Sequence, residues 1–313
     1  MSDSVTKIKI QGWLNIGLVV VVQLVAFGLL WLGSRLGWEW SILLGVVYSF
    51  LLLTNYALMH EAAHHVLHKS HRGNYFLGVL VNSLFPKSYT MFEVTHKMHH
   101  LGNRTDHEMF DHFYPSDSKV IRYIQWYGIL TGLHYLIVPI GSFMIATVPW
   151  LFHTKLFKRS RFSSILFDDF KGWVLLKVRL ETIFTILYWV SMFLLLRLDW
   201  WTVIIFYACF GFNWSTRQYV THAWTPRDVM DGATNLKVNR IMGLILLNGQ
   251  WDHAHHRFPF LPWTELTNKK YHLIEPVSYL SQYLSLWKGP RLTIKPGPDV
   301  MAEADQLANV VYE

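Results

Sequence analysis

The chain contains very little cysteine and little charge. Cys209 is the only cysteine among 313 residues, and 16% of the residues are charged. One cysteine excludes an intramolecular disulfide and a cysteine-ligated metal cluster within the chain. No glycine-rich dinucleotide motif and no evident haem-binding segment are present. With 52% hydrophobic residues and 15 tryptophans, the composition is too apolar for an ordinary soluble domain and indicates a membrane protein.

Two long apolar runs predict membrane-spanning helices. Residues 14–33 and 40–59 carry no charge, and about 20 apolar residues are needed to cross ~30 Å of hydrocarbon as a helix. The first run is longer than the apolar part of a signal peptide and lacks a small-residue cleavage site after it. We therefore expect it to remain in the mature protein.

A second apolar hairpin is predicted at residues 181–196 and 200–218, around the polar turn Arg197-Leu198-Asp199. Between the two hairpins, residues 123–150 are apolar but interrupted by glycines and a proline. If the histidines before and after this stretch bind metal together, they must lie on one side of the membrane. The stretch is then a re-entrant or interfacial hairpin, or two short crossings, rather than one span.

These elements predict an all-α integral membrane bundle with about four transmembrane helices plus interfacial or re-entrant helices. No repeat or linker divides residues 1–313, so we expect a single domain with a mostly polar C-terminal tail from about residue 289.

The basic residues are distributed unevenly between the two predicted sides. The two short connections hold only Arg35 and Arg197, whereas the termini and the other segments hold Lys7, Lys9, Lys69, Arg72, Lys97, Arg104, Lys119, Arg122, Lys155, Lys158, Arg159, Arg161, Lys171, Lys177, Lys269 and Lys270. The positive-inside rule places the basic side, with all the histidine clusters, in the cytoplasm. Contact with anionic lipid headgroups accounts for the net charge of +7, and no arginine-aromatic pattern indicates nucleic acid.

Histidine is unusually clustered. Ten of the 17 histidines fall into three boxes and one further position: His60, His64 and His65; His96, His99 and His100; His222; and His253, His255 and His256. Spacings of three and four residues place imidazoles on one face of a helix. Nine or ten imidazoles exceed the four ligands of a zinc ion and suit two ions, although imidazole binds zinc, copper, iron and nickel alike.

Three polar residues that lie near the clustered histidines in the sequence could act beside a metal. Gln218 precedes His222 by one helical turn, so its amide could hold a metal-bound water beside the imidazole. Asp106 and Glu108 could accept hydrogen bonds from ligand imidazoles or could be ordinary surface charges.

Two other classes of protein compete with a two-metal enzyme. His60-Glu61-Ala-Ala-His64 is an HExxH sequence, in which two histidines bind zinc and the glutamate acts as base in metalloproteases. That interpretation leaves the other clusters without a role. A metal transporter or store would need polar residues along a path through the membrane, and the clear spans hold few apart from Gln23.

The order of the boxes resembles the integral-membrane fatty acid desaturase and hydroxylase superfamily. The resemblance covers about residues 55–263 and implies a non-haem di-iron centre with O2 as co-substrate. Carried over by position, the ligands are His60, His64, His65, His96, His99, His100, His222, His255 and His256. The last box departs from the usual HxxHH, because Asp252 stands where a histidine is expected and His253 is displaced by one position. Either residue could be the ligand, and a carboxylate is acceptable to iron.

The same resemblance implies removal of hydrogen from an unactivated C–H bond of a fatty acyl or lipid chain. We expect desaturation, with hydroxylation, ketolation or decarboxylation to a terminal alkene as alternatives. Because no flavin, nicotinamide or haem site is evident, a separate electron donor similar to ferredoxin, rubredoxin or cytochrome b5 is expected at the basic cytoplasmic surface.

Overall fold

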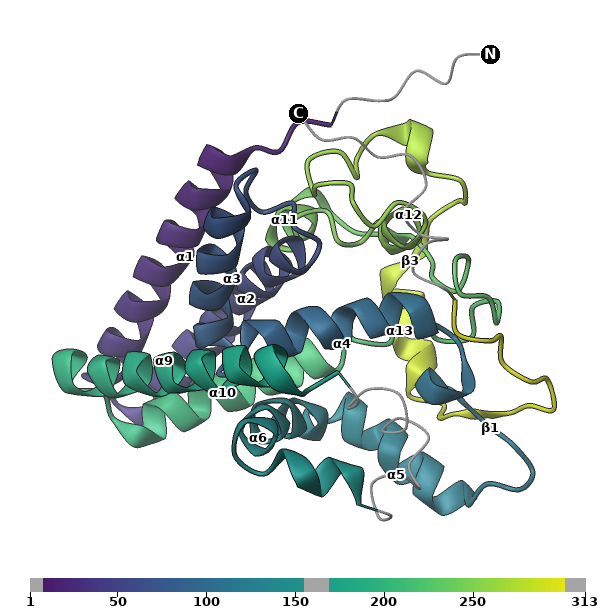
Figure 1. Cartoon of the computed structure of the whole chain (residues 1–313), viewed down its shortest axis with the longest axis horizontal. Helices are drawn as coiled ribbons and strands as arrows, with labels where there is room; N and C mark the ends of the chain where they lie inside the picture. Colours follow the sequence, from purple (N-terminus) through teal and green to yellow (C-terminus); the bar gives the residue numbers. More distant parts are fainter. Residues whose placement is uncertain (1–7, 155–168, 302–313) are drawn as a thin grey trace.

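The fold is helical, as predicted. The computed structural model describes residues 8–154 and 169–301. Its α-helices are α1 (Gly12–Gly33), α2 (Trp38–Ala63), α3 (His71–Leu84), α4 (Tyr89–Gly102), α5 (Lys119–Leu130), α6 (Leu133–Thr147), α9 (Gly172–Leu196), α10 (Trp200–Ser215), α11 (Arg240–Ile245), α12 (Asp252–Arg257) and α13 (Tyr279–Leu286) (Figure 1).

Short 3-10 helices and strands connect the α-helices. The 3-10 helices are η1 (Asp106–Glu108), η2 (Pro149–His153) and η3 (Lys269–Tyr271). The strands have two residues each: β1 (His112–Phe113) pairs with β4 (Arg291–Leu292), and β2 (Leu236–Lys237) pairs with β3 (Val277–Ser278), both in parallel.

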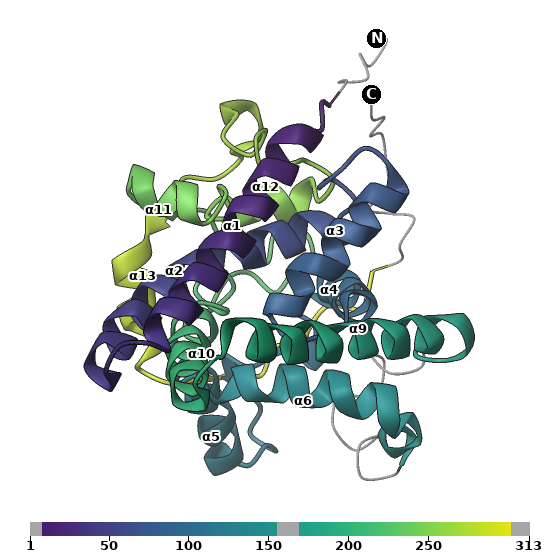
Figure 2. The same ribbon diagram turned by 90° about the vertical axis from the view of Figure 1, so that its left-hand side faces the viewer.

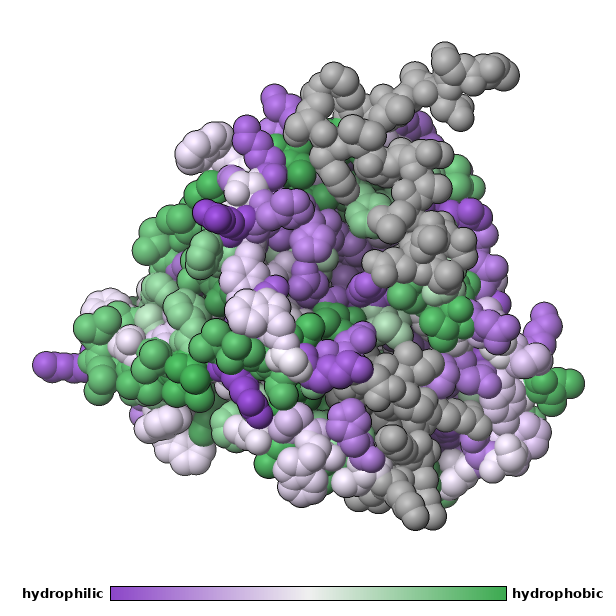
Figure 3. Space-filling view, in the orientation of Figure 1, coloured by the Kyte–Doolittle hydropathy of each residue, from purple (hydrophilic) through white to green (hydrophobic). Residues whose placement is uncertain are grey.

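Three helices in the described part of the chain are long and apolar enough to cross a membrane: α1, α2 and α9. Their outward side chains are large and apolar, for example Trp13 on α1, Val47 on α2 and Leu195 on α9. In Figure 3, apolar surface gathers over the side of the molecule formed by α1, α9 and α10. An all-α membrane bundle explains this surface, because lipid rather than water covers it.

The stretch between the two hairpins is not a single straight span. Helices α5 and α6 meet at an angle of 89° and together amount to a fourth candidate, either a broken span or a re-entrant loop. Gly132 occupies the bend with a φ of 93°, a conformation that glycine adopts without steric cost. A Cβ at this position would lie 3.0 Å from the Phe212 backbone of α10.

The second hairpin differs from its prediction at both ends. Helix α9 begins at Gly172, whereas the sequence predicts a start at Glu181, because the charges of Lys177 and Arg179 lower the hydropathy of its first turns. Helix α10 ends at Ser215 rather than Gln218. At about 1.5 Å per residue, its 16 residues are shorter than ~30 Å of hydrocarbon, and α10 is not among the three candidate spans.

The two short connections lie together at one end of the bundle. Arg35, which follows α1, donates hydrogen bonds to the carbonyl oxygens of Leu196 and Arg197 at the end of α9, each at 3.0 Å. These bonds satisfy carbonyl groups that a helix end leaves without partners. The two connections that the sequence predicts on one side therefore lie next to each other in the structure.

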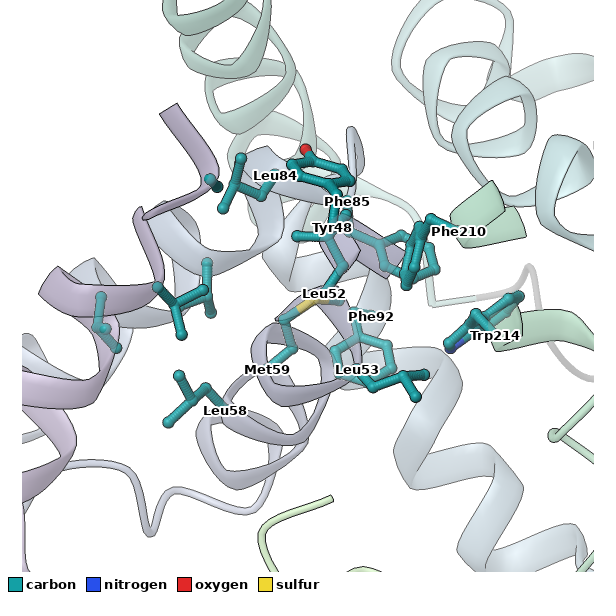
Figure 4. Close-up of a cluster of buried hydrophobic side chains, with 14 of the residues drawn as sticks. Tyr48, Leu52, Leu53, Leu58, Met59, Leu84, Phe85, Phe92, Phe210 and Trp214 are labelled. Atoms are coloured by element: carbon teal, nitrogen blue, oxygen red, sulfur yellow. The ribbon is translucent and has the colours of Figure 1, made fainter. Parts of the chain in front are cut away.

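The core forms around α2. Helix α2 packs against α1, α3 and α10 (Figures 1 and 2). Buried side chains of α2 meet Leu84 and Phe85 from the end of α3 and Phe210 and Trp214 of α10 (Figure 4). Phe85 is central to this cluster, with ring centroids 5.4 Å from Phe210 and 5.0 Å from Trp214. This packing fixes α2 against α10.

The C-terminal tail folds back toward the segment after α4. Strand β4 pairs with β1, and the Met301 amide donates to the Leu101 carbonyl oxygen of α4 at 2.9 Å. Five of the basic residues used to predict sidedness lie outside the described residues, as does the end of the tail: Lys7, Lys155, Lys158, Arg159, Arg161 and residues 302–313.

Candidate metal centre

Helix ends deliver most of the clustered histidines to one place. His60 occupies the last turn of α2 and His64 its C-cap, while His96, His99 and His100 follow one another along the last turns of α4. His255 and His256 come from α12, and His222 lies in the turns that follow α10. Residues distant in sequence therefore converge where α2 and α4 end.

The beginning of α4 is fixed by a carboxylate of α9. Glu181 accepts hydrogen bonds from the Ser88 hydroxyl at 2.6 Å, the Thr90 hydroxyl at 2.6 Å and the Thr90 amide at 2.8 Å. A carboxylate at a helix N-terminus also interacts favourably with the helix dipole. This anchor sets the position and rotation of the helix that carries three histidines.

The five-histidine group consists of His60, His64, His96, His100 and His255, whose potential ligand atoms all lie within 4.8 Å of one another. Three contacts join Nε2 atoms directly: His64 to His96 at 2.8 Å, His96 to His100 at 3.2 Å, and His100 to His255 at 3.0 Å. Nitrogen atoms that converge in this way fit a metal site.

The three-histidine group consists of His99, His222 and His256, again with ligand atoms within 4.8 Å of one another. Asp252 lies beside it, with Oδ2 at 3.2 Å from His222 Nε2 and 4.0 Å from His256 Nε2. This buried oxygen has no hydrogen-bond partner among the described residues. A carboxylate oxygen left without a donor and facing imidazoles is a natural fourth ligand.

Two histidines of the three-histidine group have partners that orient them. His99 Nδ1 lies 2.6 Å from Glu108 Oε2, and His222 Nδ1 lies 3.1 Å from the Gly232 carbonyl oxygen. An acceptor at Nδ1 fixes the tautomer with the proton on that atom and leaves Nε2 for a metal. Glu108 is therefore placed as an orienting acceptor, whereas Asp106 accepts from Arg227 at 2.6 Å and contacts no clustered histidine.

Burial and mutual repulsion keep most of these imidazoles unprotonated. Desolvation, followed by the neighbouring histidines, holds the pKa values of His64, His96, His100, His255 and His256 well below the ordinary value. The pKa of His99 is different: burial lowers it, but Glu108 and Asp252 together raise it, and the net direction is upward. Unprotonated imidazole is the form that binds metals.

Two sequence-predicted ligands are not brought into either group. His65 follows the end of α2 with a φ of 61°, so its side chain turns outward, is 52% exposed, and lies 3.2 Å from Glu93. His253 lies on another face of α12 from Asp252, His255 and His256, because successive helical residues are rotated by about 100°. Its Nε2 lies 3.0 Å from Asp231. Both residues therefore lie outside the two histidine groups, and a role for either as a ligand stays a prediction from the sequence.

Gln218 lies near the histidines but is already hydrogen-bonded. Its Nε2 donates to the Trp214 carbonyl oxygen at 3.2 Å, and its Oε1 accepts from the Tyr56 hydroxyl at 3.4 Å. Both Gln218 and Tyr56 line the cavity beside the two histidine groups. The structure therefore places Gln218 where a water or substrate could contact it.

A cavity of about 730 Å³ opens onto both histidine groups. Its walls include His60, His96, His99, His222, Asp252, His255 and His256, and then continue as mostly apolar residues of α2, α4, α6 and α10, among them Leu53, Phe92, Ile137, Val138, Ile145 and Trp214. Such a volume and lining suit a small apolar ligand or part of a lipid chain. The sequence did not reveal this cavity, because its walls come from helices as far apart in the chain as α2, with Leu53, and α13, with Tyr279.

The donor set fits two metal ions. Five imidazoles converge in one group and three imidazoles with a carboxylate in the other, and the two groups touch through the stacked rings of His100 and His256, whose centroids are 4.5 Å apart. Imidazole and carboxylate ligands together suit iron, which does not need a sulfur ligand. Cys209, the single thiol, lies on α10 outside both groups.

Comparison with known proteins agrees with the geometry. The family model described as fatty acid desaturase matches residues 36–287, which include every histidine of both groups. A search of curated proteins found no match.

Proposed function

The chain belongs to the fatty acid desaturase family, and from this premise we propose that it is a membrane-bound di-iron oxidase that uses O2 to remove hydrogen from a fatty acyl or lipid chain. We propose double-bond formation as the reaction. The observation that carries the proposal is the pair of adjoining histidine groups at the wall of one apolar cavity.

Each part of the chain has a role in this proposal. The five-histidine group would hold one iron, and the three-histidine group with Asp252 would hold the other. When bound, the two irons supply the reduction of O2 and the removal of hydrogen from carbon. The apolar walls hold the acyl chain, exclude bulk water and bring one methylene next to the histidines. Glu108 and the Gly232 carbonyl oxygen keep His99 and His222 in the metal-binding orientation.

Hydroxylation, ketolation and decarboxylation to a terminal alkene are the alternative outcomes of the same hydrogen removal. Which product forms depends on where the chain is held relative to the metals. The mass of the oxidised lipid distinguishes the alternatives, because desaturation removes two hydrogens and hydroxylation adds one oxygen.

A separate protein must supply the electrons. The sequence contains no dinucleotide-binding glycine motif, so a ferredoxin, rubredoxin or cytochrome b5-like donor would dock on the basic side. We place that side, with the histidines, in the cytoplasm. Arg35 and Arg197, which lie together at the other end of the bundle, are the basic residues of the two short connections, and this asymmetry supports the assignment.

The zinc protease alternative is less consistent with the geometry. His60 and His64 of the HExxH sequence lie in a group of five histidines rather than with one further ligand. Glu61, which would act as the base, accepts a hydrogen bond from the Trp263 amide at 3.0 Å. Its carboxylate is thus used to hold the segment that follows α12.

The test is oxidation of lipids in cells that express the chain, with His96→Ala and His255→Ala as inactive variants. His71→Ala is the matched control, since His71 is exposed and belongs to neither group. We expect lipids lighter by two hydrogens with the wild type and the control, and no change with the two variants. Unchanged lipids from an iron-loaded wild type supplied with O2 and electrons would refute the proposal.

A further inference from the structure

One buried cation in the cavity has no role in holding metal. Lys87 lies in the turn between α3 and α4, is 5% exposed, and lines the cavity. Its Nζ faces three aromatic rings, at 3.6 Å from the Phe92 centroid, 4.3 Å from Phe85 and 6.0 Å from Tyr56. Among residues 8–154 and 169–301, burial is the only influence found on the pKa of Lys87, with no hydrogen bond and no carboxylate partner at its Nζ.

An ammonium group in these surroundings is unstable without an anion. Moving a charge from water into an apolar site is unfavourable unless the charge is paired, and aromatic faces compensate only in part. Burial accordingly moves the pKa of Lys87 well below its usual range. Methionine would fill the same space without this penalty. Ionisable residues within membrane proteins usually mark a binding or transport site for that reason.

The other cation of the cavity differs from Lys87. Arg217 donates hydrogen bonds to Asn213 Oδ1 at 2.8 Å and to the Tyr279 hydroxyl at 2.5 Å, and it is only partly buried. The Nε and Nη1 atoms of its guanidinium are therefore engaged within the protein. Lys87 is the cation that faces the cavity with its donors free.

Lys87 is also close to the histidine groups. Its Nζ lies 3.6 Å from the centroid of Phe92, and that ring lies 5.4 Å from His96. Together these distances place Nζ within about 9 Å of the His96 ring. An anion bound at Lys87 would occupy part of that space, so only a short length of an attached chain would separate it from the histidines.

We propose that Lys87 binds the carboxylate of a free fatty acid and that the chain thereby selects the free acid over its neutral esters. This inference rests on the proposed function for its acyl substrate. A single carboxylate supplies the missing counter-ion in a charge-assisted hydrogen bond of about 2.8 Å. The carbons nearest the carboxylate are then the ones presented to the histidines.

Binding can be tested without metal turnover. Radiolabelled dodecanoate and methyl dodecanoate are bound at equilibrium to the full-length chain in detergent, with no O2 or electron donor required. We expect the wild type to bind the acid at least ten-fold more tightly than the ester. Lys87→Met should lose that preference while it retains ester affinity, and Lys87→Arg should keep the preference. Equal binding of acid and ester by the wild type would overturn the inference without any variant.

Lys270→Met is the matched control. Lys270 also lies over an aromatic ring, with Nζ 4.6 Å from the Tyr271 centroid, but it does not line the cavity. This variant should bind both probes as the wild type does. A Lys87→Met protein that melts at the wild-type temperature and still prefers the acid would also overturn the inference. Selective binding without oxidation would refute only the proposed function, and oxidation with unselective binding would refute only the role of Lys87.

Discussion

Glu108 offers the sharpest test of how the three-histidine group is organised. Its Oε2 lies 2.6 Å from His99 Nδ1, a distance typical of a charge-assisted hydrogen bond, and its side chain is 19% exposed. Acceptors of this kind contribute 10- to 100-fold to metal affinity, or about 1.4 to 2.8 kcal/mol. Glu108→Gln keeps an acceptor but loses the charge, so we expect about a 10-fold loss. Glu108→Ala loses both, and we expect about a 100-fold loss.

The assay is iron content per chain as free iron is lowered, measured by elemental analysis of detergent-purified protein. The wild type should approach two irons, whereas Glu108→Ala should fall toward one, because the five-histidine group does not depend on Glu108. Asp106→Asn is the control. It removes one negative charge two residues away, and Asp106 contacts Arg227 rather than a clustered histidine. Glu108→Ala with two irons at wild-type affinity would refute the orienting role.

Other variants and conditions test the remaining features. His64→Ala should lose iron and activity while His65→Ala keeps both within about two-fold, since only His64 belongs to a metal group; equal losses by iron analysis would contradict this. Metal-free protein should melt at lower temperature as the pH falls below about 6.5. The pKa values of its buried histidines are lowered, so below this pH the unfolded chain binds more protons than the folded chain. The free energy of unfolding then falls by up to about 1.4 kcal/mol per pH unit for each of these histidines. A melting temperature unchanged between pH 7.5 and 5.5 would contradict it. Oxidation of labelled dodecanoate should fall within the first few carbons from the carboxyl group, as Lys87 implies, whereas mid-chain products by mass spectrometry would not fit.

Much of the fold follows from local sequence. Uncharged runs of about 20 residues identify α1 and α2, and interruptions by Gly132 and Pro139 indicate the bend between α5 and α6. The start of α9 is not evident from the sequence because Lys177 and Arg179 interrupt its apolar run. Glu181 is compatible with the helix because Ser88 and Thr90, at the start of α4, donate hydrogen bonds to it. Such compensation is visible only once the two helices are packed together.

The site was predictable as a set of residue types but not in its details. Helical spacing brings His96 and His100 to one face of α4. The same rule cannot separate His64 from His65, since that depends on α2 ending at Ala63. The sequence likewise does not decide between Asp252 and His253 as the ligand. In the structure the two residues lie on different faces of α12, and only Asp252 lies beside the three-histidine group. Lys87 gave no signal in the sequence, because its importance comes from burial and from the absence of an anion near its Nζ in the described residues.

The most direct test of the central claim is metal content per chain together with mass spectrometry of lipids from expressing cells. The account predicts close to two irons per chain, and lipids lighter by two hydrogens in the presence of O2 and an electron donor. One zinc per chain with unchanged lipids would contradict it and would favour the HExxH sequence of α2 as a protease site.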